Sequence, residues 1–474
     1  MIFQRLRQFR GVEFQLLVTV LLFFAAGYLL VVTATRQQAF VASVPGVLSI
    51  LWPSTLPLLL FIGVSVGLSF HSPNADQILL PLVALLAGFS LMLTARLEPS
   101  LNQIYFCDIY NRAGEVVGSG PCYEGVAAKQ SLWVTMGVII LAVMLFVPWD
   151  RLLIRTMRLS LIDFLDHHRY IWLGLGLLLI FATFIFGVDP NGSGVKVWFN
   201  FGAFLFQPSE LLKIILVIFM ASYLNEHREV VASGSGYRLG PLTLPPLPYL
   251  VPIIGMWGIA MATIVFQRDL GAALLLFGVF LAMLYAATSR GLYVLVAVLA
   301  FAIGAYVLYQ FLPVVSLRVS IWLDPWSVAQ GYGYQIVQAI YALSSGGIFG
   351  TGLGMGVPAI VPAIHTDFIF TAVGEELGLA GTLAVLIAYV LLIFRGFHIA
   401  LAIPGRFRGF EQLLAVGLTT IIAVQTIIIL GGNLRLIPLT GITLPFISYG
   451  GSSVLINFLV VGLLMRISAG TRRG

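Results

Sequence analysis

The stretch LYVLVAVLAFAIGAYVLYQFL, residues 292–312, contains no charged residue. A helix of about 20 apolar residues crosses the hydrocarbon core of a bilayer, so this stretch is long enough to span a membrane. The whole chain has the same character, because 59% of its 474 residues are hydrophobic and 9% are charged. We therefore expect an integral membrane protein, and the lack of alternating strand-length segments argues against a β-barrel.

Similar apolar stretches recur along the chain, and they predict an all-α polytopic fold with about twelve transmembrane helices. The predicted spans are residues 14–35, 49–70, 78–95, 132–148, 170–188, 211–224, 250–266, 270–288, 292–312, 368–394, 413–430 and 452–465. The first span is long and lacks a small-residue cleavage site, so we expect an anchor and not a removed signal peptide. The first two spans carry almost no polar residue, which predicts a peripheral pair (residues 1–76) beside a ten-helix core (residues 77–474).

Basic residues predict how the chain is oriented. Cytoplasmic loops of membrane proteins carry an excess of Lys and Arg. Placing both termini in the cytoplasm assigns most of the 25 Lys and Arg residues to that side, including Arg151, Arg155, Arg158, Arg395, Arg406, Arg408, Arg472 and Arg473. The net charge of +6 therefore indicates cytoplasmic anchoring and gives little reason to expect a nucleic acid partner.

The two cysteines, Cys107 and Cys122, fall in one predicted outer loop. An oxidising compartment favours a disulfide between them, and two free thiols are the alternative. Neither cysteine belongs to a spacing that is typical of a metal site.

The predicted outer segments are richer in functional residue types than the cytoplasmic loops. Residues 189–210, the large loop 312–367 and residues 431–451 hold glycines, aromatics and isolated charges. Long structured loops often carry function. We therefore expect the working face on the outer side.

Two outer segments combine acids and bases at helix starts. In FQPSELLK, Ser209 and Glu210 are typical of a helix start, and Glu210 can also pair with Lys213 three residues later. In QRDLGAAL, Arg268 and Asp269 form a structural ion pair, a helix-start carboxylate or an orienting pair that faces a polar groove; the sequence leaves these alternatives open.

Two further segments place polar groups next to apolar helices. HTDFIFTAVGEELGLAG contains Glu375 and Glu376, and burying two carboxylates requires partners or protonation. Asp367 in the same segment can act simply as a charge at a helix N-terminus. In LPFISYGGSS, the hydroxyls of Ser448 and Ser452 can bind a polar headgroup or satisfy helix ends.

Several function classes find no support in the sequence. It contains no nucleotide-binding loop, no Ser-His-Asp set in a recognisable context and no zinc motif. Carboxylates, cations and aromatics on an outer face beside lipid suit a lipid-linked polar substrate. From the residues alone, chemistry and transport both remain open.

Five ordered motifs carry a resemblance to a known family. FQPSELLK, QRDLGAAL, GYGYQIVQAIYALSSGGIFGTGLGMG, HTDFIFTAVGEELGLAG and PLTGITLPFISYGGSS together resemble the shape, elongation, division and sporulation (SEDS) family of RodA/FtsW-type cell-wall proteins. The resemblance covers about residues 78–466.

The resemblance implies a ten-helix SEDS core and peptidoglycan glycosyltransferase activity on lipid II, the undecaprenyl-linked cell-wall precursor. It also implies a class B penicillin-binding protein as partner and the bacterial cytoplasmic membrane as location. The residues expected to bind substrate are Lys196, Glu210, Lys213, Arg268, Asp269, Arg318, Tyr334, Gln335, His365, Asp367, Glu375, Glu376, Ser448 and Ser452. No cofactor is indicated, and a divalent cation at the departing pyrophosphate is left open.

The chain departs from the family pattern where catalysis is expected. Aligning WLDPWSVAQGYGYQ, residues 322–335, on its last three residues puts Val328 at the position of the usual catalytic aspartate. Asp324 is the only carboxylate in residues 312–364, and it is either a substitute base or a turn cap through its Asp-Pro step. Three smaller departures are Arg268 in place of proline, Ala272 in place of threonine and Ala363 in place of glutamate.

Three functions therefore compete. The first is a SEDS glycosyltransferase. The second is a catalytically degenerate SEDS scaffold that partners a transpeptidase or a division complex. The third is a flippase of lipid-linked precursors, although the charges crowd the outer side and do not mark a midplane pathway. The sequence does not decide between elongation, division and sporulation.

Overall fold

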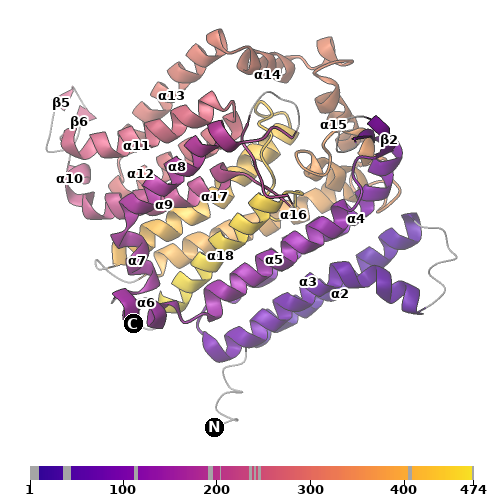
Figure 1. Ribbon diagram of the computed structural model, residues 1–474, viewed down its shortest axis with the longest axis horizontal. Helices are drawn as coiled ribbons and strands as arrows, with labels where there is room; N and C mark the ends of the chain where they lie inside the picture. Colours follow the sequence, from indigo (N-terminus) through magenta and orange to yellow (C-terminus); the bar gives the residue numbers. More distant parts are fainter. Residues whose placement is uncertain are drawn as a thin grey trace. The chain divides into compact units, whose positions relative to one another are not determined.

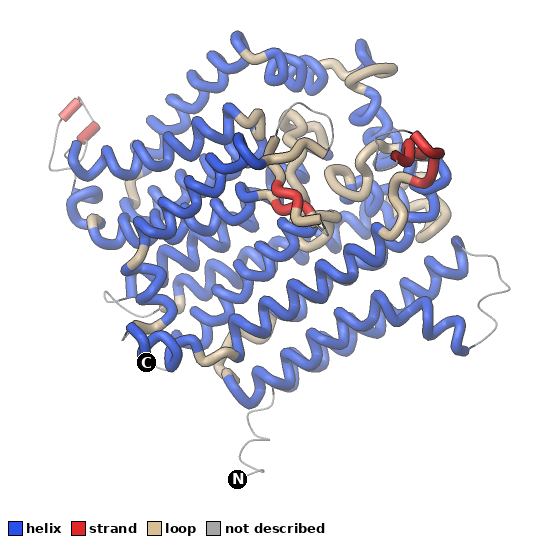
Figure 2. Tube along the Cα trace, in the orientation of Figure 1, coloured by secondary structure: helices blue, strands red, loops and turns tan. Residues whose placement is uncertain are grey.

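The computed structural model describes residues 10–35, 44–110, 116–157, 159–190, 196–202, 204–233, 238–239, 242–243, 247–403 and 408–471. Helices account for most of these residues, and the strands are confined to short two-stranded ribbons (Figures 1 and 2). Four of the arginines used to predict the orientation, Arg158, Arg406, Arg472 and Arg473, lie outside the described residues.

A helix lies over each of the twelve predicted spans. These helices are α2 (Gly11–Thr35), α3 (Val44–His71), α4 (Leu79–Ile104), α5 (Val126–Phe146), α8 (Arg169–Phe186), α9 (Pro208–Glu226), α11 (Leu247–Phe266), α12 (Leu270–Thr288), α13 (Gly291–Phe311), α16 (Ile369–Leu401), α17 (Gly409–Asn433) and α18 (Gly451–Thr471). Among the described residues, 10 helices are long and apolar enough to cross a membrane. The described side chains of α3 and α11 give shorter apolar helices, Thr55–His71 and Val251–Phe266. The protein is therefore a multi-pass membrane protein.

Shorter elements connect these helices. They are α6 (Trp149–Met157), α7 (Leu161–His167), α10 (Arg228–Ser233), α14 (Pro313–Leu323), α15 (Tyr334–Ser345) and the 3-10 turns η2 (Trp326–Val328) and η3 (Pro358–Ile360). The strands pair as antiparallel ribbons: β1 (Phe106–Tyr110) with β2 (Val116–Pro121), β3 (Phe199–Asn200) with β4 (Leu205–Phe206), and β5 (Arg238–Leu239) with β6 (Leu242–Thr243).

The chain divides into two compact units. Unit 1 comprises Met1–Ala142, Ser320–Leu392 and Ile429–Phe458, and unit 2 comprises Val143–Val319, Ile393–Ile428 and Leu459–Gly474. Each unit is built from three separate segments of the chain, whereas the predicted division was a single boundary between residues 76 and 77. The peripheral pair of helices and the ten-helix core therefore stay a prediction. The two units are described separately below.

In unit 1, helix α4 forms the centre of the packing and α2 covers it. The apolar window of α4 is 89% buried, whereas that of α2 is 17% buried. Gly88 of α4 allows this close contact, because a Cβ atom there would lie 2.3 Å from the ring of Phe24. The Phe24 ring also meets Phe89 edge-on at 5.1 Å. Helix α2 therefore packs on α4 and also contacts α3, and its outward-facing surface is left for lipid.

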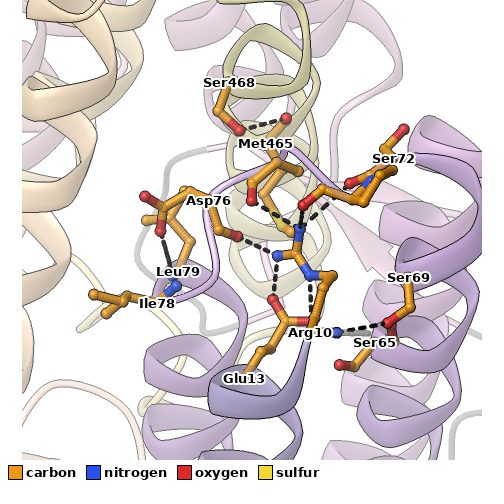
Figure 3. Close-up of polar contacts among 12 residues, drawn as sticks. Arg10, Glu13, Ser65, Ser69, Ser72, Asp76, Ile78, Leu79, Met465 and Ser468 are labelled. Carbon is orange, nitrogen blue, oxygen red and sulfur yellow. Dashed lines mark hydrogen bonds and ion pairs between the residues drawn. The ribbon is translucent and has the colours of Figure 1, made fainter. Parts of the chain in front are cut away.

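A buried arginine fixes the beginning of α2 (Figure 3). Arg10 is 1% exposed and pairs with Glu13 one turn later. Its guanidinium donates hydrogen bonds to the carbonyls of Ala75 (2.7 Å) and Asp76 (2.6 Å), in the turn between α3 and α4. Asp76 in turn accepts the backbone N–H groups at the start of α4. Because each charge has several partners, the cluster holds these helix ends together despite being buried.

The β1–β2 hairpin of unit 1 is closed by a disulfide. Cys107 and Cys122 are bonded with their Cα atoms 5.1 Å apart. The N–H of Cys122 also bonds to the carbonyl of Tyr105 (3.2 Å). The tyrosines that flank the hairpin, Tyr105 and Tyr123, are thereby brought together, with ring centroids 5.7 Å apart.

In unit 2, small residues let the helices approach closely. A Cβ atom at Gly278 of α12 would lie 2.8 Å from Val424 of α17, and one at Gly417 of α17 would lie 2.5 Å from Val217 of α9. By contrast, the apolar window of α13 is only 6% buried. Helices α9, α12 and α17 therefore form the core of unit 2, and α13 presents most of its surface to lipid.

Candidate functional site

The predicted site residues fall into two groups, one in each unit. Unit 1 contains Asp324, Tyr334, Gln335, His365, Asp367, Glu375, Glu376, Ser448 and Ser452, and unit 2 contains Lys196, Glu210, Lys213, Arg268, Asp269 and Arg318. Each group is described within its own unit.

Glu376 of α16 is held by a buried arginine of α4. The Nε of Arg96 lies 2.8 Å from Oε1 of Glu376, and the two side chains are 4% and 1% exposed. The same guanidinium donates to the hydroxyl of Ser100 (2.9 Å) and to the carbonyl of Gly356 (2.8 Å). The other oxygen of Glu376 accepts the N–H of Gly354 (3.1 Å). Glu376 and Arg96 together therefore tie α4 to the glycine-rich loop before η3.

Glu375 holds the next part of the same loop. Its Oε1 accepts the N–H of Val357 (2.7 Å), and its main-chain carbonyl accepts the N–H of Thr351 (2.9 Å). Gly350, at φ +83°, is needed for this approach, because a Cβ atom there would lie 2.2 Å from the carbonyl oxygen of Glu376. Both glutamates thus have the partners that their burial requires, and these partners are mainly in the loop backbone.

His365 lies in a cluster of aromatic rings. Its ring centroid is 4.8 Å from that of Tyr123 and 5.6 Å from that of Tyr449. The residue is 8% exposed, and its Nδ1 atom has no hydrogen-bond partner among the described residues. Burial lowers the pKa of His365 to about 4, so the imidazole is neutral at pH 7. Burial also raises the pKa of the Tyr123 and Tyr449 hydroxyls, so this cluster is uncharged.

Asp367 and Ser448 belong to a network that fixes the loop before α18. The carbonyl of Asp367 accepts Nδ2 of Asn433 (2.7 Å). The hydroxyl of Ser448 donates to the carbonyl of Thr366 and accepts the N–H of Leu444 (2.8 Å). Ser452 is buried at the start of α18. Ser448 was predicted either to bind a polar headgroup or to satisfy helix ends, and in the structure its hydroxyl hydrogen-bonds to backbone groups.

Asp324 caps a compact turn and remains exposed. Its Oδ1 accepts the N–H of Trp326 (3.2 Å), and its carbonyl accepts the hydroxyl of Ser327 (3.0 Å). Val328 is 37% exposed, and its carbonyl accepts the N–H groups of Gly331 and Gly333, both at 3.0 Å. The turn-capping role is therefore present, and the exposure of Asp324 leaves its carboxylate accessible as well.

Tyr334 and Gln335 begin helix α15 directly after this turn. Tyr334 is 39% exposed. Gln335 donates from Nε2 to the carbonyl of Pro362 (2.8 Å). Gln335 is thus engaged in fixing the loop, whereas the ring of Tyr334 is open to contact.

In unit 2, Glu210 and Lys213 form the ion pair that their spacing predicted. Lys213 is 3% exposed, and its Nζ lies 2.7 Å from Oε2 of Glu210 and 2.9 Å from Oε1 of Gln425. Pro208 starts α9 immediately before them. The pair therefore sits in the first turns of α9, with α17 supplying a third polar group.

Asp269 is the helix-start carboxylate that was one of its predicted alternatives. Its Oδ1 accepts the N–H of Ala272 (3.0 Å) at the start of α12, and its Oδ2 accepts Nε2 of Gln207 (3.1 Å). Burial raises the pKa of the Asp269 carboxyl, and the negative charge of Glu210 adds to the increase. The N–H of Ala272 and the charge of Arg318 oppose it. Asp269, Glu210 and Arg318 therefore interact electrostatically within one unit.

Lys196 and Arg268 are the exposed cations of unit 2's predicted set. Neither side chain makes a polar contact with the described residues, so Arg268 does not pair with Asp269. Arg268 has a φ of 55°, a left-handed conformation that is uncommon for a non-glycine residue. It lies between the end of α11 and the start of α12, and it is exposed.

Comparison with known proteins identifies the family. Residues 119–473 match the family model of the cell cycle proteins FtsW, RodA and SpoVE. The chain belongs to this family. It is 38% identical over 424 residues to the peptidoglycan glycosyltransferase RodA of Mycobacterium tuberculosis, covering 88% of this chain and 82% of that one. It is 36% identical over 444 residues to RodA of Mycobacterium leprae, covering 94% of this chain and 87% of that one.

Solved structures show the same fold. A chain from a structure of a peptidoglycan synthase complex, described as coordinating polymerization and crosslinking, aligns with a TM-score of 0.64. The alignment covers 84% of this chain and 99% of that chain at 24% identity. This likeness shows that the two chains share a fold.

Three side chains of this family member contribute to the network and were missed from the sequence. Arg96 and Asn433 hold predicted site segments, and Gln425 completes the environment of Lys213. Arg96 is not among the predicted site residues, and the predicted third span ends one residue before it. A charged residue at the end of a strongly apolar run is the signal that could have identified it.

The described part of this family member contains no group of three or more His, Cys, Asp or Glu residues that could hold a metal ion. The available chemistry is supplied by carboxylates, cations and neutral hydrogen-bonding groups. Asp324 can accept a proton, and Lys196 and Arg268 can offset negative charge. His365 can take part in a neutral hydrogen bond.

Proposed function

We propose that this protein is a peptidoglycan glycosyltransferase that polymerises lipid II on the outer face of the bacterial cytoplasmic membrane. The observation that carries this proposal is the 38% identity, over 88% of the chain, to a peptidoglycan glycosyltransferase RodA. The exposed polar residues of both units support it, because a lipid-linked sugar needs cations and a base beside a membrane.

The proposed reaction joins two lipid-linked glycans. A sugar hydroxyl of the acceptor attacks the anomeric carbon of the donor, and the bond to the donor's lipid pyrophosphate breaks. The hydroxyl proton passes to a base, and the bonding electron pair leaves with the pyrophosphate. A base and positive charges near the leaving group are therefore the two requirements.

In this proposal, Asp324 is the substitute base because Val328 has no proton-accepting group. Asp324 is exposed, and its turn is held by hydrogen bonds to Trp326 and Ser327. The candidate cations are Lys196, Arg268 and Arg318. Since Asp324 also caps the turn, the proposal predicts low or condition-dependent polymerase activity.

Val328 favours a second candidate, a degenerate scaffold for a transpeptidase. A class B penicillin-binding protein is the proposed partner in either case. We further propose that the protein lies in the bacterial cytoplasmic membrane with both termini in the cytoplasm, because the distribution of basic residues favours this orientation.

The experiment compares lipid II polymerisation, read as glycan chain length on a gel, by wild type and four variants. Asp324→Asn keeps an oxygen for the Trp326 N–H but removes the base, whereas Asp324→Ala removes both. Val328→Asp restores the usual carboxylate, and Val328→Asn is its matched uncharged control.

An active wild type that loses activity as both Asp324→Asn and Asp324→Ala supports the base assignment. If both variants keep full activity, the base lies elsewhere. If wild type is inactive and Val328→Asp, but not Val328→Asn, produces glycan chains, the scaffold function is correct. Reporter fusions after residue 474 and within residues 312–367 test the orientation, and both reporting the cytoplasm would contradict it.

A further inference from the structure

Helix α17 ends with a backbone pattern that usually requires glycine. The N–H of Arg435 bonds to the carbonyl of Gly432 (3.1 Å), and the N–H of Leu436 bonds to that of Gly431 (2.7 Å). This pair of hydrogen bonds is the Schellman motif, whose left-handed position is most often glycine. Arg435 occupies that position with a φ of 56°. The backbone alone favours glycine here, so the reason for an arginine is expected in its side chain.

The side chain of Arg435 holds the end of another helix. Its Nε donates to the carbonyl of Trp322 (2.8 Å), and its Nη2 donates to that of Leu323 (2.6 Å). In return, Nε1 of Trp322 donates to the carbonyl of Arg435 (3.0 Å). The last carbonyls of a helix lack intrahelical partners, and a cation at that end is favoured by the helix dipole. The guanidinium of Arg435 therefore caps the C-terminus of α14 with two hydrogen bonds, and the carbonyl of Arg435 accepts a third from Trp322.

The capped residues lead directly into the turn that carries Asp324. This turn is also constrained at its other end, because a Cβ atom at Gly333 would lie 2.4 Å from the carbonyl oxygen of Pro325. Gly333 also donates to Val328. With Arg435 at its beginning and Gly333 at its end, the turn has little freedom to shift.

We propose that Arg435 is a positioning residue that fixes the turn 324–328 for glycan transfer. The proposal rests on the proposed function for its effect on catalysis. Arg435 acts through Trp322 and Leu323 and is assigned no contact with substrate.

The test uses the full-length protein in lipid nanodiscs. Arg435→Gly removes the side chain and gives the left-handed position its preferred residue, so the α17 end is not strained by the change. Arg435→Lys keeps the charge but cannot bond to two carbonyls as a planar fork. Leu436→Ala, a truncation of the exposed neighbour, is the matched control. Amide hydrogen exchange of residues 324–333 and the kcat and KM of lipid II polymerisation are measured.

In Arg435→Gly we expect amide exchange in residues 324–333 to accelerate about tenfold or more, because the turn opens locally more often. We expect kcat to fall about 10- to 100-fold with little change in KM, since misplacing a reacting group by about 1 Å has an effect of that size. Arg435→Lys should lie between wild type and Arg435→Gly, and Leu436→Ala should match wild type.

Unchanged exchange in Arg435→Gly would overturn the proposal, whatever the activity. A wild-type kcat with accelerated exchange would overturn the catalytic part, because a looser turn would then be of no consequence. If wild type forms no glycan chains, the proposed function fails, and accelerated exchange in Arg435→Gly still establishes Arg435 as the residue that holds the turn.

Discussion

Replacing Arg96 by methionine tests how much of unit 1 depends on one buried ion pair. Arg96 makes three hydrogen bonds, to Glu376, Ser100 and Gly356, and its side chain is 4% exposed. Methionine preserves most of the apolar stem but leaves the carboxylate of Glu376 buried with the N–H of Gly354 as its remaining partner.

The expected cost follows from that stranded charge. Removing one partner of a buried pair costs about 3–5 kcal/mol, because the charge left behind is neither solvated nor paired. The free energy of unfolding of the Arg96→Met protein in detergent micelles should fall by this amount. Arg96→Lys should lose less, because it keeps the charge but not the geometry that reaches three acceptors.

A double-mutant cycle identifies the source of the loss. Glu376→Gln should itself be destabilising, because it strands the guanidinium of Arg96. The double variant should be more stable than the sum of the single changes predicts, by about 1–3 kcal/mol. Additive changes, or a loss below about 1 kcal/mol in Arg96→Met, would show that the pair does not hold this part of the protein.

Three other changes test separate features of unit 1. Because burial lowers the pKa of His365 to about 4 whereas the unfolded value is near 6.5, stability should be full above pH 6.5 and fall by about 3 kcal/mol as the pH drops towards 4; a His365→Gln protein with the same pH dependence would contradict this. Gly350→Ala should destabilise the protein and lower its thermal midpoint, because Gly350 is at φ +83° and its Cβ atom would meet the carbonyl of Glu376; Ser344→Ala is the exposed control. Cys107→Ser should lower the free energy of unfolding by about 3 kcal/mol, because the disulfide that closes a 15-residue loop is lost. A wild-type protein that is equally stable with the disulfide reduced and oxidised would contradict this prediction.

The sequence predicted features that depend on local pattern. Each of the twelve predicted spans coincides with a helix, because an apolar run of sufficient length is a strong local signal. The ion pair of Glu210 and Lys213 was also predictable, since residues three apart meet on one helix face. The disulfide between Cys107 and Cys122 could be predicted because both cysteines fall in one loop that is expected to face an oxidising compartment.

Contacts between distant segments were not predictable. Arg96 and Glu376 are 280 residues apart, and the sequence around Arg96 does not indicate which residue it will pair with. The left-handed backbone of Arg435 follows from how α17 ends, and its bonds to Trp322 span 113 residues. Propensity and spacing describe one segment at a time, whereas these contacts depend on which segments the fold brings together.

The structure narrows the predicted site by showing which side chains are already occupied. Glu375, Glu376 and Ser448 are buried, and their polar atoms hold loop backbone, so using them on a substrate would break bonds that support the fold. Lys196 and Arg268 are exposed and make no polar contact with the described residues. Asp324 is exposed and uses Oδ1 for its turn. The exposed residues are therefore the better candidates for chemistry, and the buried acids of unit 1 are better assigned to holding the backbone of their own loop.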